Sequence, residues 1–318
     1  MEIKNNLEFS VYSDSLCRMD QFLSVVLNLN RTKVGKLIKS GNILLNGACS
    51  KSGIRLKQKD RISVLNLSEL NSAKNEDVIV KVTNTYIKTA HYTIPIIYND
   101  EDILILNKPS GLLVHEATSN NSDNLVRILR RSDIKLYNST SGREGIVHRL
   151  DQYTEGLIIF AKSKLAYDSL KEQFKNRNVT KKYYAVLKGV PVEREGVIDR
   201  LIGRDSSVRA RKSCDHFVKG SEKTAITKYK VIEEFTNLVL VDIALITGRT
   251  HQIRVHFASI GHPVLGDSLY SKQTQKVEGY YLQSYFVGFS HPKTNKTCEF
   301  KLLVSDRLKK YAKSCDYD

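Results

Sequence analysis

Several features are scarce or missing in this sequence of 318 residues, and each absence excludes a class of protein. There is no tryptophan, and the five cysteines are widely spaced with no CxxC pair. An odd number of scattered cysteines fits neither a disulfide framework nor a zinc site, so we expect reduced thiols in a cytoplasmic protein. No apolar run approaches the roughly 18–20 residues that span a membrane, and we expect no secretory signal.

Acidic residues are also scarce relative to basic ones. The chain has 34 Asp and Glu against 50 Lys and Arg, a formal net charge of +16. This excess indicates a polyanionic partner, and we expect nucleic acid rather than a membrane surface because no basic amphipathic helix is evident. The composition, 41% hydrophobic and 26% charged, is otherwise typical of a globular protein. The length suggests about two domains, and the missing GxGxxG and GxxxxGK[ST] patterns exclude common nucleotide-binding classes.

Half of the net positive charge of +16 lies in residues 17–65, which contain ten basic and two acidic residues. Apolar side chains at helical spacing predict a helix over residues 20–28. A second helix is predicted after Thr32, whose side chain is placed to cap it. Short strands at residues 43–45 and 61–65 complete a small α/β fold.

The basic side chains of this segment fall outside its apolar stripes, and Lys33, Lys36 and Lys39 of the second predicted helix are examples. A solvated charged surface is one interpretation, but the arrangement favours a surface that binds phosphates. The segment resembles the S4-like RNA-binding module. The residues that carry this resemblance are Arg18, Met19, Asp20, Leu23, Arg31, Val34, Leu37, Ile38, Gly41, Asn46, Gly47, Asp60 and Ile62.

A second, larger domain is predicted for residues 93–318. Residues 1–16 are interpreted as an N-terminal extension, and the polar stretch 66–92 as a linker. Strands are predicted at residues 103–106, 156–161, 183–187, 227–231 and 238–245. Ser163 is placed to cap a helix. Because strands and helices do not alternate regularly, we predict an α+β domain built on a largely antiparallel mixed sheet.

Four segments of this domain combine charged, aromatic and glycine residues; they are 107–115, 145–157, 181–187 and 247–256. Each segment alone has a structural interpretation: a turn between strands, a cap carboxylate, strand aromatics facing a core, and a basic sheet edge with Arg and His in strand-like alternation. The histidines at 115, 251 and 256 show no metal-ligand spacing. We therefore predict no metal site, and we expect His115, His251 and His256 to be structural or to contact RNA.

In this order and spacing, the four segments together resemble the RluA/RluD-type pseudouridine synthases. The matching motifs are NKPxGLxVH at 107–115, HRLDxxTSG at 148–156, KxYxA at 181–185 and GRTHQIRVH at 248–256, followed by the family's tail from Gly261 to Tyr270. Glu155 stands where the family usually has Ser. An S4-like module before the catalytic domain is a common arrangement in this family.

The resemblance implies that uridine in RNA is converted to pseudouridine without a cofactor or metal. By motif position, Asp151 is the catalytic carboxylate, Arg254 is its ionic partner and Tyr183 stacks on the uracil. Arg149 would fill the gap left by the flipped nucleotide. An Arg partner favours the ionised carboxylate against desolvation. The sequence leaves open whether Asp151 attacks C1′ or C6, or removes a sugar proton.

The residues predicted to contact RNA come from the basic module and from the motifs. They are Arg18, Arg31, Lys33, Lys36, Lys39, Lys51, His148 and Arg249. A further basic loop, residues 200–212, either contacts the RNA backbone or is solvated. We expect a monomeric protein that acts on structured RNA, above all large-subunit (23S) rRNA or its precursor. The alternative is a non-catalytic RNA-binding or ribosome-assembly factor that retains the synthase fold, and Glu155 is the departure that favours it.

Overall fold

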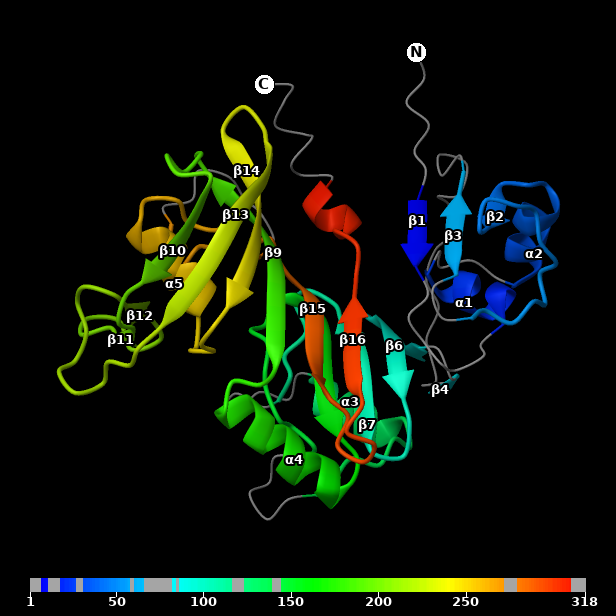
Figure 1. The fold of residues 1–318 in the computed structure, drawn as a ribbon, viewed down its shortest axis with the longest axis horizontal. Helices are drawn as coiled ribbons and strands as arrows, with labels where there is room; N and C mark the ends of the chain where they lie inside the picture. The colour runs from blue at the N-terminus through cyan, green and yellow to red at the C-terminus, as the bar shows by residue number, and fades with distance from the viewer. Residues whose placement is uncertain are drawn as a thin grey trace.

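The chain folds around two main sheets, a small one near the N-terminus and a large one that holds most of the strands (Figure 1). The structure, a computed structural model, describes residues 7–10, 18–26, 31–57, 60–65, 82–83, 86–115, 123–138, 144–271 and 279–309. Within these ranges no helix is both long and apolar enough to cross a membrane. Among the described residues, Cys49, Cys214 and Cys298 form no disulfide bond, and the other two cysteines lie outside these ranges.

The N-terminal unit has its own sheet and core. Its strands run in the order β1-β3-β2. The elements are β1 (Leu7–Ser10), α1 (Met19–Val26), α2 (Arg31–Lys39), β2 (Ile43–Leu45) and β3 (Arg61–Val64). Apolar side chains of both helices and of β2 and β3 form a separate buried cluster. This core explains why the helices carry an apolar stripe on one side only.

The predicted elements of residues 17–65 are confirmed with one difference. Helix α2 begins at Arg31, so Thr32 lies inside its first turn and is not the capping residue. The predicted cap is therefore wrong by a residue or more, because several polar residues precede the apolar stripe and the stripe alone does not specify where the helix begins. Lys36 and Lys39 are exposed and Lys33 is half-buried.

The large sheet has eleven strands in the order β10-β13-β14-β9-β15-β8-β7-β6-β5-β4, with β16 paired to β15. They are β4 (Val82–Thr83), β5 (Tyr86–Lys88), β6 (Thr93–Asn99), β7 (Ile103–Lys108), β8 (Glu155–Ala161), β9 (Thr180–Lys188), β10 (Glu195–Asp199), β13 (Ile226–Glu234), β14 (Leu238–Leu245), β15 (Leu282–Ser290) and β16 (Thr297–Lys301). In the described chain β15 and β8 pair in parallel, and the other neighbours are antiparallel. The predicted α+β class and the five predicted strand positions are confirmed.

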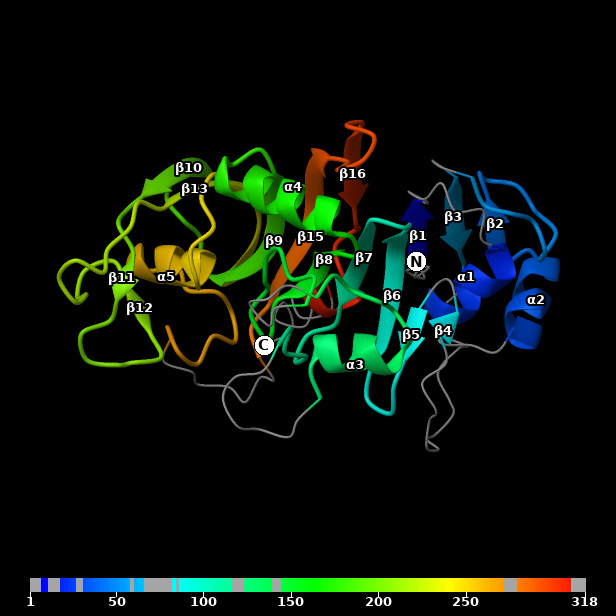
Figure 2. The same ribbon diagram turned by 90° about the horizontal axis from the view of Figure 1, so that it is seen from below.

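Side chains alternate between two cores along the central strands. On β7, Ile103 and Ile105 belong to one buried cluster, and Leu104 and Leu106 to the other. Helix α4 (Lys164–Lys175) packs with the first cluster, whereas α3 (Leu125–Arg131) and α5 (Gln252–Ser259) pack with the second. Figure 2 shows α4 and α3 on opposite sides of the central strands. Because both faces are covered, these strands are apolar throughout.

Helix α4 begins where the sequence predicts. The Ser163 hydroxyl accepts a hydrogen bond from the Ala166 N–H at 3.1 Å, which satisfies one of the free donors of the first turn. The same hydroxyl donates to the Asp102 carboxylate at 2.6 Å. The N-cap therefore also ties the helix to the turn before β7.

Part of the predicted linker extends the large sheet. Strands β4 and β5 pair with each other, and β5 pairs with β6 at the sheet edge. The rest of the linker, residues 66–81, 84 and 85, lies outside the described residues. The domain limits predicted from composition stay predictions.

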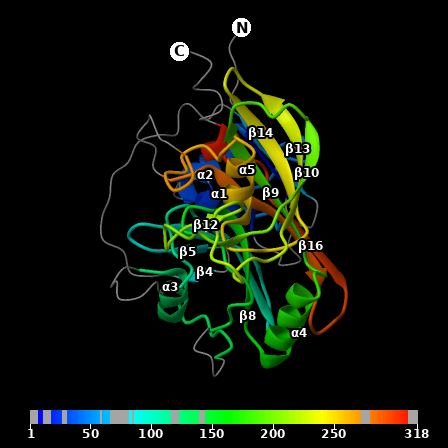
Figure 3. The same ribbon diagram turned by 90° about the vertical axis from the view of Figure 1, so that its left-hand side faces the viewer.

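The strand-like interpretation of residues 247–256 is wrong. The chain turns at Thr247–His251 and then forms α5, which lies beside β13 (Figure 3). Ile253 and Phe257 pack in the core under the sheet, while Val255 packs on the other side against Tyr270. Because two opposite sides of the helix are buried, every second residue from Ile253 to Phe257 is apolar. The sequence therefore shows the alternation that is typical of a strand.

Candidate active site

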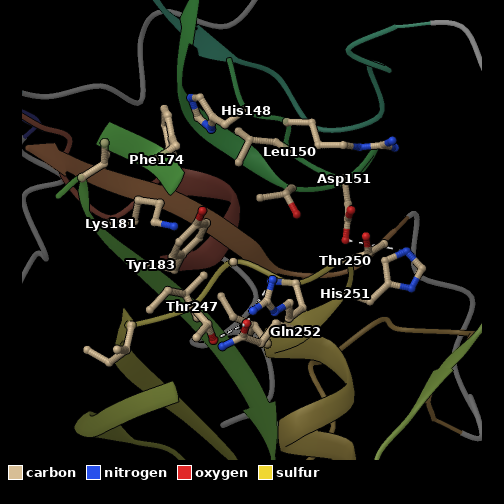
Figure 4. Close-up of a pocket in the computed structure, with 18 of the residues that line it drawn as sticks. His148, Leu150, Asp151, Phe174, Lys181, Tyr183, Thr247, Thr250, His251 and Gln252 are labelled. Atoms are coloured by element: carbon tan, nitrogen blue, oxygen red, sulfur yellow. Dashed lines mark hydrogen bonds and ion pairs between the residues drawn. The ribbon is translucent and has the colours of Figure 1, made fainter. Parts of the chain in front are cut away.

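A cavity of about 530 Å³ opens between β9, the loop before β8 and the turn that leads into α5. Its volume suits a single nucleotide. Figure 4 shows Tyr183 in the middle of the cavity, Asp151 and His251 at one side, and Lys181 and Phe174 at the other. Three of the four sequence motifs contribute lining residues, so segments far apart in the chain meet here.

The first motif supplies the support beneath the site. Lys108, at the end of β7, is fully buried, and its ammonium group donates to the backbone carbonyls of Pro109, Leu112 and Gln152 at 2.8–2.9 Å. Burial lowers the pKa of Lys108, and the carboxylates of Glu155 and Asp151 oppose this shift. The lysine therefore joins the loop after β7 to the residue that follows Asp151.

Asp151 lies in the loop before β8 and shares an arginine with a second carboxylate. Nη1 of Arg254 is 3.5 Å from Oδ2 of Asp151. The guanidinium makes a tighter, bidentate pair with Asp267, at 2.6 Å from Nε and 2.9 Å from Nη2. Asp267 is fully buried, whereas the Asp151 side chain keeps 18% of its exposure. The predicted ion pair is present, but Asp267 is the main partner of Arg254.

Two tyrosine rings hold the Arg254 guanidinium from the sides. Its carbon lies 4.2 Å from the ring centre of Tyr280 and 5.1 Å from that of Tyr270. Burial opposes the charge of Arg254, but the hydrogen bond to Asp267 and the charges of Tyr280, Asp267 and Asp151 together outweigh burial and raise the pKa of Arg254 above its usual value. A cation stacked on aromatic faces and paired bidentately has little freedom to move.

Tyr183 lies on β9, between β14 and β15, and is almost fully buried. Burial raises the pKa of Tyr183 to about 12, although a hydrogen bond with Ser284 opposes the shift. The phenol is therefore neutral near pH 7. It presents a flat ring and a neutral hydroxyl to the cavity (Figure 4).

The turn before α5 is fixed by one buried amide. The Gln252 side-chain oxygen accepts from the Thr247 hydroxyl at 2.8 Å and from the Arg249 N–H at 2.9 Å. Its NH2 group donates to the Ile226 carbonyl and the Thr227 hydroxyl, both at 3.0 Å. All hydrogen-bonding groups of this buried amide are thus engaged, which holds the turn rigidly over the cavity.

His148 and Lys181 form the wall opposite Asp151. Nε2 of His148 accepts a hydrogen bond from the Ile159 N–H at 2.9 Å, and its ring stacks on Phe174 at 4.7 Å. Burial lowers the pKa of His148 to about 3, and the charge of Lys181 adds to this effect. His148, predicted to bind RNA, is therefore a neutral ring held by protein contacts, and Lys181 is the cation of this wall.

The rim of the cavity is basic. Arg149 is exposed beside Asp151, and Arg249 is half-exposed, with its Nε donating to the Thr224 carbonyl at 3.0 Å. Lys175 and Arg177, at the end of α4, also line the cavity. Sequence reasoning missed these two residues, because only the fold brings the end of α4 next to the turn before α5. Lys181 was noted as part of the KxYxA motif but was given no role.

The basic residues of the N-terminal unit have two kinds of environment. Arg18 and Arg31 both bind the buried Asp20, at 3.0 and 2.8 Å. Burial opposes ionisation of Asp20, but hydrogen bonds from the two arginines outweigh burial and hold its pKa at about 2. Lys51, like Lys36 and Lys39, is exposed. The two arginines therefore brace the unit, and the lysines carry its outward charge.

The basic loop 200–212 contains β11 (Gly203–Arg204) and ends in β12 (Lys212–Ser213), which pair as a separate two-stranded sheet. Arg200 pairs with Asp215, and Arg211 lies 3.7 Å from Asp205. Arg204 and Arg209 are exposed.

Glu155 starts β8, and its carboxylate accepts a hydrogen bond from the Ser305 hydroxyl at 2.5 Å. Burial raises the pKa of Glu155, which Ser305 and Arg307 oppose. Glu155 does not line the cavity in the part of the chain that the structure describes. The Glu155 carboxylate thus faces the C-terminal segment and not the cavity that contains Asp151.

With this geometry established, comparison with known proteins is decisive. Residues 102–259 match the RNA pseudouridylate synthase family. The chain is 35% identical over 288 residues to "Uncharacterized RNA pseudouridine synthase YlyB" of Bacillus subtilis, covering 89% of each chain. This chain belongs to the RNA pseudouridine synthase family. It is an isomerase that acts on uridine in RNA.

Two further similarities extend this assignment. "Ribosomal large subunit pseudouridine synthase D" of Zymomonas mobilis is 31% identical over 297 residues, again covering 89% of each chain. The solved structure of "Human RNA Pseudouridylate Synthase Domain Containing 4" has a TM-score of 0.54 and 23% identity, covering 67% of this chain and 90% of that one. The synthase thus shares its fold with a human protein.

Three residues of the synthase site lie within the matched motifs or the tail after them, but sequence reasoning assigned none of them a catalytic role. Lys108 was expected only in a turn, Asp267 was noted without a role, and His251 was expected to be structural or to contact RNA. In the structure Nε2 of His251 lies 3.8 Å from Oδ2 of Asp151. His256, by contrast, ties Thr227 to the Arg200 carbonyl and does not reach the cavity among the described residues.

Proposed function

We propose that the protein converts specific uridines of structured RNA to pseudouridine with Asp151 as the catalytic carboxylate. The observation that carries the proposal is the position of Asp151, part-exposed at the cavity with one oxygen near Arg254 at 3.5 Å. A carboxylate that lies near a cation but is not closed in a tight pair keeps an oxygen available to a substrate. The position of the Asp151 carboxylate is compatible with attack at C1′, with attack at C6 and with removal of a sugar proton.

The other cavity residues suit the fate of the detached base. The N1–C1′ bond breaks, the uracil turns, and C5 bonds to C1′. C5 then loses its proton and N1 takes one up, so the overall change is an isomerisation. A flat buried ring such as Tyr183 holds the uracil by stacking and permits rotation in its plane. With a pKa near 12, the Tyr183 hydroxyl stays protonated and takes part as a neutral hydrogen-bonding group. No step needs a cofactor.

Arg149 is proposed to support base flipping. A uridine inside a stem must leave its stack before it enters the cavity, which costs a few kcal/mol. Arg149 is exposed at the rim directly before Leu150 and Asp151, so its planar guanidinium can occupy the vacated place while the nucleotide lies in the site.

Large-subunit (23S) rRNA, mature or as a precursor, is the proposed substrate. The similarity to a relative named for the ribosomal large subunit supports this choice. The N-terminal unit supports it as well, because its exposed lysines give an S4-like RNA-binding module a surface for phosphates. We further propose a cytoplasmic, monomeric protein that modifies rRNA during its processing.

The alternative function, a non-catalytic ribosome-assembly factor, is disfavoured. Its support was Glu155, whose carboxylate is bound to Ser305 and does not line the cavity in the described chain. The cavity keeps a carboxylate, an arginine and a tyrosine in reach of one nucleotide.

The test is Asp151→Asn in cells where this gene is the sole copy, with pseudouridines mapped by a chemistry that blocks reverse transcription. We expect the target sites in large-subunit rRNA to become unmodified, while Asp168→Asn, an exposed aspartate of α4, leaves them modified. Sites that stay modified with Asp151→Asn would refute the catalytic role. Sites lost from transfer RNA instead would refute only the proposed substrate.

A further inference from the structure

His251 has an unusual backbone and a defined place beside Asp151. It precedes α5 with φ 58°, in the left-handed region that few residues other than glycine and asparagine adopt. Its ring lies beside Asp151 at the edge of the cavity (Figure 4). Nε2 lies 3.8 Å from Oδ2 of Asp151, the same oxygen that Nη1 of Arg254 approaches at 3.5 Å.

A chain of hydrogen bonds determines which nitrogen of His251 carries the proton. The Tyr270 hydroxyl oxygen accepts from the Lys212 N–H at 2.8 Å and lies 3.0 Å from Nδ1 of His251. Tyr270 is buried, so its single hydrogen needs an acceptor, and Nδ1 is the one within reach among the described residues. Nδ1 is then the acceptor, and the proton of the neutral ring sits on Nε2, facing Asp151.

The surrounding charges agree with a neutral ring. The groups that face His251 are Asp151, Arg254, Asp267, Lys212 and Tyr270. Burial lowers the pKa of His251, and the attraction of Asp151 is countered by Arg254. A neutral Nε2–H next to a carboxylate donates without adding a second full charge.

We propose that His251 is a positioning residue that, as its Nε2–H form, holds one oxygen of Asp151 together with Arg254 and leaves the other oxygen facing the substrate. The 3.8 Å gap closes to a hydrogen bond when RNA excludes water from the cavity, as catalytic contacts often tighten in the complex. The inference rests on the proposed catalytic role of Asp151.

Two amide substitutions separate the function of Nε2 from the shape of the turn. Asn tolerates the left-handed backbone but places its amide near the position of Nδ1, too short to reach Asp151. Gln places its amide near the position of Nε2 and keeps a donor there. A structural role predicts that His251→Asn is the milder change, whereas positioning of Asp151 predicts that His251→Gln is the milder one.

Tyr270→Phe provides an independent variant. It keeps the ring beside Arg254 and removes only the hydroxyl that sets the tautomer of His251. Tyr285→Phe is the matched control, because it also removes a hydrogen-bonded tyrosine hydroxyl. That hydroxyl donates to the Asp242 carboxylate at 2.9 Å and lies outside the cavity lining.

The assay measures single-turnover tritium release from a large-subunit rRNA transcript made with 5-tritiated uridine, using the full-length chain. We expect His251→Asn and Tyr270→Phe to slow the rate constant about tenfold, the value of one hydrogen bond to a charged group. His251→Gln should recover most of the rate, RNA affinity should stay within twofold throughout, and Tyr285→Phe should match the wild type.

A direct observation of the tautomer completes the test. Two-bond proton–nitrogen correlation spectra of protein labelled with ¹⁵N-histidine, assigned with His251→Gln, should show the Nε2–H form of His251 and its loss in Tyr270→Phe. An Nδ1–H form in the wild type, or full activity of His251→Asn, would overturn the inference. If Asp151→Asn keeps its activity, the proposed function fails instead, so the two failures are distinguishable.

Discussion

At the scale of single residues, Arg254 divides its charge unequally between two carboxylates. Asp267 is fully buried and receives two short hydrogen bonds, whereas Asp151 receives one contact of 3.5 Å. The Asp267 pair anchors the guanidinium whether or not Asp151 is engaged with a substrate. In the proposed reaction, Asp151 can therefore change its bonding without loss of its neighbouring cation.

This division predicts opposite outcomes for two matched Asp→Asn substitutions. Asp267→Asn removes one partner of a buried ion pair and should lower the free energy of unfolding by about 3 kcal/mol. Asp151→Asn removes only a long, part-exposed contact and should change it by less than about 1 kcal/mol while abolishing activity. Urea denaturation of both variants measures the difference, and equal midpoints would contradict it.

Lys108 is a structural residue hidden in a motif. Lys108→Met removes the donor of one buried and two part-buried backbone carbonyls. It should lower the free energy of unfolding by about 3 kcal/mol, since a buried acceptor left unsatisfied costs about 1–3 kcal/mol and part-buried ones cost less. The loop that carries Asp151 should also become more accessible to proteases. Lys228→Met, at an exposed position of β13, is the control and should leave both measurements unchanged.

At the scale of elements, the turn before α5 and the strand β9 meet at the cavity because α5 is a helix. A strand at residues 247–256 would have spread His251 and Arg254 along a sheet edge. The helix instead brings Arg254 one turn beyond His251, so both side chains reach the same oxygen of Asp151. The geometry of the proposed site thus depends on α5, the helix for which the sequence pattern had indicated a strand.

The attachment of the motif loop to β8 predicts a pH effect on stability. His148 accepts from the Ile159 N–H as a neutral ring, and its pKa is about 3 when folded against about 6.5 when unfolded. Between these pH values the unfolded chain binds more protons than the folded chain. The stabilisation that neutral His148 gives the folded chain is therefore complete above about pH 6.5 and is lost as the pH falls toward 3.

The measurement is the urea midpoint of the wild type and of His148→Gln at pH 7.5 and pH 5. Gln keeps an acceptor near the position of Nε2 but does not titrate in this range. We expect a smaller loss on acidification for His148→Gln than for the wild type and for the control His216→Gln, an exposed site. Equal losses in all three proteins would show that His148 protonation does not limit acid stability.

At the scale of the whole molecule, the net charge of +16 separates into parts. Some basic side chains are bound within the protein, as Arg18 and Arg31 are to Asp20 and Arg254 is to Asp267. Others, such as Lys36 and Lys39, face the solvent. Only the second kind is available to release counterions from RNA.

This separation predicts the salt dependence of RNA affinity. The double substitution Lys36→Gln and Lys39→Gln should reduce the slope of log affinity against log salt by about 1.4, because each phosphate contact on a single strand contributes about 0.7. The single-turnover rate at saturating RNA should not change. Lys296→Gln with Lys301→Gln, two exposed lysines near β16, is the control, and an equal reduction there would contradict a localised docking surface.

The sequence by itself was sufficient for the class of fold, the positions of the main strands, helix α4 with its Ser163 cap, and three of the motifs whose residues meet at the cavity. Local patterns carry this information, because burial on one or both faces leaves a period and caps are local. The motif order was sufficient for the family.

Only the tertiary structure decided how those residues share their interactions. Asp267 is the main partner of Arg254, Lys108 binds the Gln152 carbonyl, and His251 faces Asp151. These pairs lie 13, 44 and 100 residues apart in the chain. No local pattern specifies them, because a hydrogen bond between distant segments depends on how the sheet and helices pack. The sequence therefore indicates which type of reaction the site supports, and the packing determines which side chains pair with one another.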